Sequence, residues 1–116
     1  MYNYLEIEPS KVEYIPVGQA ADIPPGERLF LEIDGQPIVI FNIAGKLFAI
    51  ADLCSHDDGP LGDGELEDFE IVCPRHGARF DVRNGKVLAL PAVVDIPAYP
   101  IRVVNDQIEI GLPVEE

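Results

Sequence analysis

Short segments in which apolar and polar residues alternate recur along the chain and predict β-strands. In residues 28–34 (RLFLEID), Leu29, Leu31 and Ile33 fall on one face, with charged residues on the other. The next segment, residues 37–43 (PIVIFNI), is apolar at nearly every position, which is typical of a central strand covered on both faces. The pattern therefore predicts a half-buried strand beside a fully buried one.

Turn-forming residues separate these segments and predict tight reversals of the chain. They are Asp34-Gly35, Gly45, Asn84-Gly85 and Asn105-Asp106. Two-residue hairpins need positive φ, which Gly, Asn and Asp tolerate best. No window has a helical period, and the 11 prolines argue against long helices. The sequence thus predicts an all-β fold of short antiparallel strands, with residues 1–116 forming a single domain.

Residues 53–78 depart from this pattern. They show little alternation until residues 70–73 (EIVC), and they contain both cysteines and both histidines of the chain. We interpret this region as a loop-rich insertion on a β scaffold. Binding residues are often placed on loops that a rigid framework holds, so this region is the first candidate for function.

Charge and hydropathy narrow the classes of partner. The 21 acidic and 8 basic residues give a net charge of −13, which disfavours nucleic acid and anionic membrane surfaces. The same charge favours a protein partner with a basic docking surface, although it could serve solubility alone. The apolar runs are too short to span a bilayer, and no secretory signal is visible. We therefore expect a cytoplasmic protein, whose thiols stay reduced.

The two cysteines and two histidines form two mixed pairs, Cys54 with His56 and Cys73 with His76. Three interpretations compete. The four residues could be ordinary core and surface residues, but chance seldom produces two such pairs. They could bind zinc, although structural zinc sites usually pair cysteine with cysteine and histidine with histidine. They could hold a [2Fe–2S] cluster, with both cysteines on one iron and both histidines on the other.

The motif C-x-H, followed after sixteen residues by C-P-x-H-G and then ARFD, resembles that of the small Rieske-type ferredoxins. The resemblance implies an antiparallel β-sandwich or barrel with a cluster-binding subdomain at about residues 52–92. It also implies one [2Fe–2S] cluster per chain, held by Cys54, His56, Cys73 and His76. In such proteins the outer ring nitrogens of both histidines face solvent, and the contact face surrounds them.

The resemblance also suggests roles for residues around the ligands. Gly59, Gly62 and Gly77 would either allow the backbone to approach the sulfurs or simply form turns. Pro91-Ala92 resembles a third loop that covers the cluster in relatives.

Four positions favour the low-potential branch of the family. Respiratory members carry a disulfide at the positions of Gly59 and Arg75, and hydroxyl side chains at those of Ala78 and Phe80. Hydroxyl donors stabilise the reduced cluster, so their loss lowers the potential. We expect a potential in the lower part of the Rieske range of roughly −150 to +300 mV.

Acidic residues between the two ligand pairs also favour a low reduction potential. Between His56 and Cys73 the sequence has seven of them and no lysine or arginine: Asp57, Asp58, Asp63, Glu65, Glu67, Asp68 and Glu70. Negative charge near a cluster disfavours the addition of an electron, although solvent screens much of the effect.

These features predict an electron carrier that is not itself an enzyme, because the chain has no dinucleotide motif and no second metal motif. The leading hypothesis is a ferredoxin that takes electrons from a flavin-dependent ferredoxin reductase and delivers them to a Rieske non-haem iron oxygenase. One alternative is the small subunit of an assimilatory NAD(P)H nitrite reductase, although many such subunits lack the ligands. The other is a structural zinc-binding interaction module.

Overall fold

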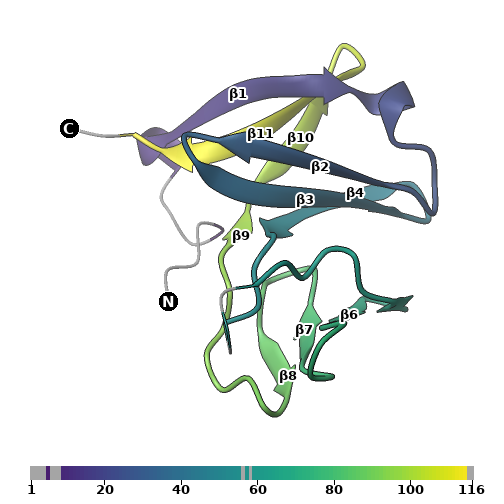
Figure 1. Ribbon diagram of the computed structural model, residues 1–116. Coiled ribbons are helices and arrows are strands. Elements are labelled where there is room, and N and C mark those ends of the chain that lie inside the picture. The colour runs from purple at the N-terminus through teal and green to yellow at the C-terminus, as the bar shows by residue number, and fades with distance from the viewer. Residues whose placement is uncertain (1–4, 6–8, 56, 58, 115–116) are drawn as a thin grey trace.

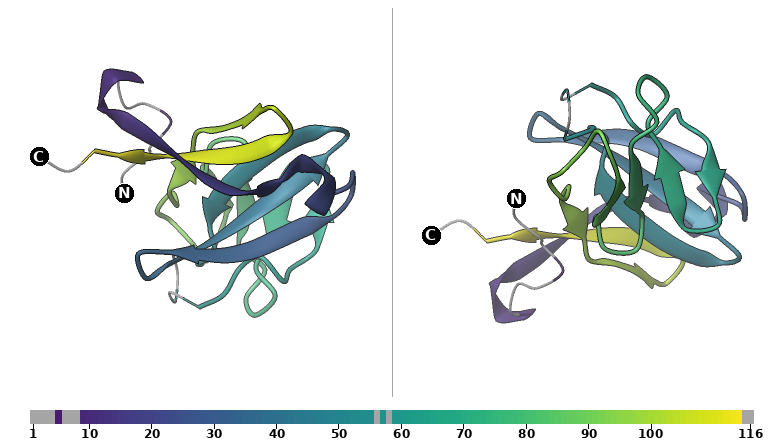
Figure 2. Two further views of the ribbon diagram at one scale, coloured as in Figure 1. Left: turned by 90° about the horizontal axis from the view of Figure 1, so that it is seen from above. Right: turned by 90° about the horizontal axis from the view of Figure 1, so that it is seen from below.

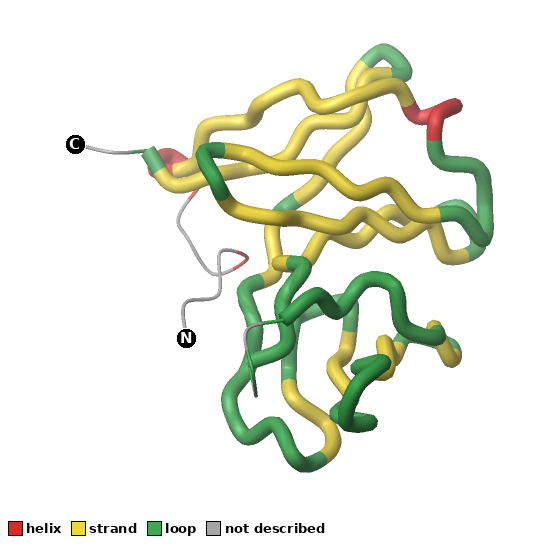
Figure 3. The backbone as a smooth tube through the Cα atoms, viewed as in Figure 1, coloured by secondary structure: helices red, strands yellow, loops and turns green. Residues whose placement is uncertain are grey.

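The computed structural model describes residues 5, 9–55, 57 and 59–114. Within them the regular structure is almost entirely antiparallel strand, which confirms the predicted all-β fold (Figures 1 and 3). The two helices described beside the strands are single 3-10 turns, η2 (Pro9–Lys11) and η3 (Ala20–Asp22). None of the described helices is long and apolar enough to cross a membrane.

The strands form three sheets. The first has the order β1-β11-β10, the second β2-β3-β4-β9 and the third β5-β6-β7-β8. In chain order the strands are β1 (Val12–Gln19), β2 (Arg28–Ile33), β3 (Gln36–Ile43), β4 (Lys46–Ala51), β5 (Leu66–Glu67), β6 (Glu70–Val72), β7 (Arg79–Asp81), β8 (Val87–Ala89), β9 (Ala98–Tyr99), β10 (Ile101–Val104) and β11 (Gln107–Pro113). The third sheet and its loops lie to one side of the first two sheets in Figure 1, and the views from above and below therefore show them overlapping (Figure 2).

Strand β3 lies between β2 and β4 and contributes to two separate cores, as its apolar sequence predicts. Because side chains alternate along a strand, Val39 and Phe41 face one side and Ile38 and Ile40 the other. Ile38 and Ile40 pack in the core that also holds side chains of β2 and β11. Val39 and Phe41 pack in a second core, which reaches the third sheet and includes both cysteines. The scaffold is thus built directly against the candidate site.

Two predicted hairpin turns have the expected backbone. Asp34 and Gly35 have φ of 51° and 82°, and β2 pairs with β3 immediately on either side. Asn105 and Asp106 have φ of 51° and 66°, between β10 and β11. Local turn chemistry is enough to fix these reversals.

The turn at Asn84-Gly85 differs in detail from the expectation, because the strands beside it are shorter than the sequence suggests. Strand β7 ends at Asp81, whose carbonyl accepts the Gly85 N–H at 2.7 Å and whose carboxylate accepts the Arg83 N–H at 2.9 Å. These hydrogen bonds draw the backbone into a loop where the sheet would otherwise continue. Gly85 has φ of 77°, and an added Cβ there would lie 2.0 Å from the Ile96 carbonyl oxygen.

Candidate metal centre

Two loops that carry the predicted ligands close in the same way. The first follows β4, and the second joins β6 to β7. The Cys54 N–H donates to the Gly59 carbonyl at 2.8 Å, and the Cys73 N–H donates to the Ala78 carbonyl at 2.7 Å. Each loop therefore returns to its cysteine after five residues. The two loops thus share a backbone hydrogen bond of the same span, although the spacing from cysteine to histidine differs between them.

Both cysteines are buried in one apolar core. Cys54 is 0% and Cys73 2% exposed, and the core around them includes Ala78, Phe80 and Ala92. The two thiols are not joined in a disulfide. Burial in apolar surroundings disfavours a bare thiolate, whereas coordination to a metal removes the proton and compensates the charge. The donor set and its surroundings therefore suit a metal site.

Of the two predicted histidine ligands, the structure describes only His76. His76 lies in the second loop with its side chain 46% exposed, so its ring reaches the surface. His56 lies outside the described residues. Among the residues that the structure does describe, no three His, Cys, Asp or Glu side chains are grouped closely enough to hold a metal ion. The structure thus brings the two cysteines into one core, and the complete four-residue ligand set stays a prediction.

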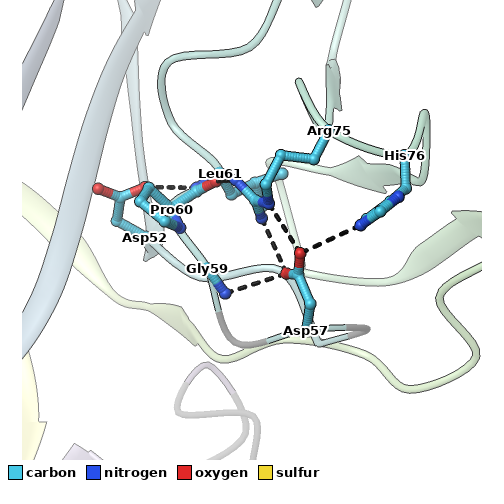
Figure 4. A network of polar contacts seen from close by, with 7 residues as sticks. All are labelled: Asp52, Asp57, Gly59, Pro60, Leu61, Arg75 and His76. Atoms are coloured by element: carbon cyan, nitrogen blue, oxygen red, sulfur yellow. Dashed lines mark hydrogen bonds and ion pairs between the residues drawn. The ribbon is translucent and has the colours of Figure 1, made fainter.

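Asp57 and Arg75 join the two loops in a contact that the sequence analysis missed (Figure 4). The Arg75 Nε and Nη2 atoms donate to the two carboxylate oxygens of Asp57 at 2.7 and 2.8 Å. Arg75 Nη1 also donates to the Pro60 carbonyl, and Asp57 accepts the Gly59 N–H at 3.0 Å. His76 Nε2 lies 3.4 Å from the same carboxylate. The sequence signal for this contact is Arg75 itself, which lies where the family resemblance puts a cysteine in respiratory members.

The contacts between Asp57 and Arg75 shift the pKa of both groups. The hydrogen bond from Arg75, followed by that from the Gly59 N–H, holds the pKa of Asp57 well below its usual range. The same hydrogen bond raises the pKa of Arg75 further above its already high value. Asp57 is therefore an anion and Arg75 a cation throughout the physiological pH range.

Two side chains hold the first loop on the scaffold, that of Asp52 directly after β4 and that of Arg28 on β2. The Asp52 carboxylate accepts the N–H groups of Leu61 and Gly62 at 2.9 and 2.6 Å. Arg28 reaches from β2 to donate to the carbonyls of Gly62 and Gly64, the latter at 2.8 Å. The guanidinium of Arg28 also lies over the Phe41 ring, 5.1 Å from its centre. The loop is thereby fixed to the sheet at its far end from Cys54.

The acidic residues of this region are less isolated than the sequence suggests. Arg79 on β7 lies 2.7 Å from Glu67 and 3.8 Å from Glu70, and Arg75 pairs with Asp57. Arginines that follow the acidic segment in sequence thus offset part of its charge in space. Asp58 lies outside the described residues.

Ala78, Phe80, Gly59 and Gly77 all lie close to the two cysteine loops. The side chains of Ala78 and Phe80 are fully buried in the cysteine core and carry no hydrogen-bond donor. A Cβ on Gly59 would meet the Arg75 guanidinium carbon at 2.8 Å, so this glycine makes room for the arginine. Gly77 has φ of 78° and nothing within 4 Å of an added Cβ, so it serves the turn.

Comparison with known proteins gives a consistent result. Residues 13–100 match the family described as the Rieske [2Fe-2S] domain. The biphenyl 2,3-dioxygenase ferredoxin component of Rhodococcus jostii (strain RHA1) is 40% identical over 93 residues, covering 80% of this chain and 87% of that protein. The 3-phenylpropionate/cinnamic acid dioxygenase ferredoxin subunit of Escherichia coli (strain K12) is 43% identical over 95 residues, covering 80% and 88%.

A solved structure agrees with these relatives. The ferredoxin of carbazole 1,9a-dioxygenase from Nocardioides aromaticivorans IC177 superposes with a TM-score of 0.76 at 33% identity, covering 82% of this chain and 95% of that one. The segment that matches the family contains both ligand loops and all strands of the second and third sheets. The chain belongs to the Rieske [2Fe-2S] domain family.

Proposed function

We propose that the protein is a one-electron carrier that delivers electrons to a Rieske non-haem iron oxygenase. The observation that carries this proposal is the pair of matched loops that place two buried cysteines in one apolar core. Relatives of nearly the same length are ferredoxin components of dioxygenase systems, which supports the same role here. The electron source would be a flavin-dependent ferredoxin reductase.

The proposed ligands are Cys54 and Cys73 on one iron and His56 and His76 on the other. When bound, a [2Fe–2S] cluster of this type accepts and releases one electron. The residues of the chain shield the sulfur side with apolar groups and leave the His76 ring at the surface, where a partner can approach. The family match favours iron and sulfide over the zinc alternative.

The protein would catalyse no reaction by itself and would act within a multicomponent system. Residues 1–116 would form one domain, with the cluster-binding subdomain at about residues 52–92. The net charge of −13 suits partners with basic docking surfaces. The cytoplasm, where thiols stay reduced, is the compartment we propose.

The first test is chemical. Protein purified anaerobically should contain iron and acid-labile sulfide in equal amounts and give a rhombic EPR signal after reduction with dithionite. Cys73→Ser and His56→Ala should each prevent assembly of the intact cluster. A colourless protein with stoichiometric zinc would contradict the proposed cofactor.

The second test concerns the role. The reduced protein should be reoxidised by a Rieske oxygenase in the presence of its aromatic substrate and oxygen, at a rate that supports turnover. Transfer of electrons to a nitrite reductase and to no oxygenase would refute the proposed partner while leaving the cluster in place.

A further inference from the structure

The ion pair between Asp57 and Arg75 joins the two ligand loops. Asp57 lies three residues after Cys54, and Arg75 two residues after Cys73. Their side chains meet through two parallel hydrogen bonds of 2.7 and 2.8 Å (Figure 4). An arginine and a carboxylate joined in this forked way are fixed in orientation as well as distance.

Both side chains also make a further hydrogen bond to the backbone of the first loop. Arg75, from the second loop, donates to the Pro60 carbonyl of the first. Asp57 accepts the N–H of Gly59 at 3.0 Å, which holds the carboxylate against its own loop. A side chain at Gly59 would collide with the guanidinium, because its Cβ would lie 2.8 Å from the Arg75 Nη2 atom. The first loop is thus shaped to receive the arginine.

A single ion pair on a protein surface usually contributes little to stability, because solvent screens the charges and the side chains lose freedom. The Asp57–Arg75 pair departs from that situation in two ways. Its side chains are only 27% and 32% exposed. Its two partners also make backbone contacts that already restrict them. The Arg102–Glu109 pair on β10 and β11 has a similar distance of 2.7 Å but one hydrogen bond, and its side chains are 52% and 17% exposed.

The Asp57 carboxylate has a second neighbour, the ring of His76. The 3.4 Å between Asp57 Oδ2 and His76 Nε2 places a fixed negative charge beside a proposed cluster ligand. Arg75, one residue earlier in the chain, supplies a positive charge on the other side of the same carboxylate. The pair therefore combines a mechanical link between loops with a dipole oriented toward His76.

We propose that Asp57 and Arg75 form a non-covalent clamp that holds the two ligand loops together around the cluster, and that their opposite charges set its reduction potential in opposite directions. The inference rests on the proposed ligand set. It assigns to these two positioning residues a role in retaining and tuning the cofactor. Arg75 lies at one of the two positions where the resemblance puts the disulfide of respiratory relatives, and Gly59, at the other position, leaves room for its guanidinium.

The two parts of the proposal predict different patterns among variants. Loss of either partner opens the clamp, so Asp57→Asn and Arg75→Gln should both shorten the lifetime of the cluster, by about fivefold. The reduction potentials of these two variants should shift in opposite directions from that of the wild type. Removing the negative charge of Asp57 stabilises the reduced cluster and raises the potential, whereas removing the positive charge of Arg75 lowers it.

Two further variants separate the link from the charge. Arg75→Lys keeps the positive charge but cannot form the forked contact, so it should shorten the lifetime with little change in potential. The double variant Asp57→Asn/Arg75→Gln should lose the cluster no faster than the worse single variant, because the two residues act as one unit. Arg102→Gln removes an ion pair outside the ligand loops and is the matched control.

The experiment uses the protein loaded with its cluster. The decay of the visible absorbance in the presence of an iron chelator gives the lifetime, protein-film voltammetry gives the potential, and circular dichroism checks that each variant is folded. Faster decay in the three single clamp variants, a double variant no faster than the worse single one, opposite shifts of potential in Asp57→Asn and Arg75→Gln, and wild-type behaviour of Arg102→Gln would support the proposal. A folded Asp57→Asn or Arg75→Gln protein that fails to take up the cluster would support the link in its strongest form.

Wild-type lifetimes in Asp57→Asn and Arg75→Gln would overturn the clamp. Potentials that move in the same direction would overturn the assignment of opposite charge effects. These failures are distinct from failure of the proposed function. Wild-type protein without iron and sulfide would remove the cofactor itself, and the identity of the electron acceptor does not enter any of the measurements.

Discussion

Ser55 donates a hydrogen bond from its hydroxyl to the carbonyl of Val94, across 39 residues of sequence. The bond ties the segment between β8 and β9 to the first ligand loop. Ala92 of the same segment is buried in the cysteine core, 2% exposed, and the covering role that the resemblance suggests for Pro91-Ala92 stays a prediction. The segment therefore lies beside the candidate metal centre.

The outer side of this segment is apolar and predicts a contact surface for the redox partner. Leu90 is 75% and Val93 73% exposed, although both follow strand β8 in a well-bonded loop. Leu90→Ser and Val93→Ser should each weaken docking by roughly three- to tenfold, because an apolar side chain buried at an interface contributes about 1 kcal/mol. Electron-transfer rates measured against oxygenase concentration would show the effect, with an unchanged reduction potential.

Val103→Ser is the control for this docking prediction. Val103 is 48% exposed on β10, in the sheet that contains neither ligand loop. Its substitution should leave the transfer rate as it is. Equal slowing by Val103→Ser and Leu90→Ser would show that general hydrophobicity, and not this surface, governs the encounter.

Ala78→Ser should raise the reduction potential. Ala78 is fully buried in the core that contains both cysteines, so a hydroxyl added there has sulfur atoms among its potential acceptors. One hydrogen bond that strengthens in the reduced state corresponds to a shift on the order of 50 mV. Voltammetry of the wild type and the variant measures it directly, and Ala92→Ser provides a second buried position for comparison. An unchanged potential in Ala78→Ser would mean that its hydroxyl satisfies itself on the backbone.

The sequence predicts the scaffold well because the relevant signals are local. The Asp34-Gly35 and Asn105-Asp106 turns depend on backbone preferences of the residues themselves, and both have positive φ in the structure. The double-sided apolar pattern of residues 37–43 reports directly that β3 is covered on both faces. The C-x-H and C-P-x-H-G motifs likewise sit in contiguous loops and can be read in one pass.

The contacts that shape the site are long-range, and the sequence does not reveal them. Arg28 meets the Gly64 carbonyl 36 residues later, and Arg75 meets Asp57 across 18 residues. Many arginines and acids could pair in a chain with 21 acidic residues, so composition does not select the actual partners. Only the folded arrangement shows that Arg79 offsets Glu67 while Arg75 joins the two loops.

Gly64→Ala should destabilise the protein by about 1 to 3 kcal/mol, because an added Cβ would overlap backbone and not a flexible side chain. The Cβ would lie 1.8 Å from the carbonyl oxygen of Val72, next to Cys73. Chemical denaturation of the cluster-loaded protein measures the loss. Gly18→Ala is the control, since its Cβ would meet Asp22 at an ordinary 3.4 Å. Equal stability of the two variants would mean that the loop shifts at little cost.

The buried carboxyl of Asp81 should make part of the free energy of unfolding depend on pH. Burial by itself would raise the pKa of this carboxyl, but hydrogen bonds from the side chain and backbone of Arg83 outweigh it, and the pKa is lowered. Asp81 is only 7% exposed, and Arg83 lies over the Phe69 ring at 4.3 Å. A carboxyl with a lowered pKa stabilises the fold above its unfolded pKa of about 3.9 and loses that contribution as pH falls through the folded value.

Asp81→Asn should therefore lower the free energy of unfolding by about 1 to 3 kcal/mol at pH 7, as expected for lost hydrogen bonds to a charged group. The difference from the wild type should shrink as pH falls below about 4, where the wild-type carboxylate takes up its proton. Urea denaturation followed by circular dichroism at several pH values measures both quantities. Arg83→Gln should also make the free energy of unfolding depend less on pH, because it removes the main hydrogen-bond donor to Asp81. A difference that stays constant down to pH values well below the normal carboxyl range would show that Asp81 stabilises the fold through shape and not through its charge.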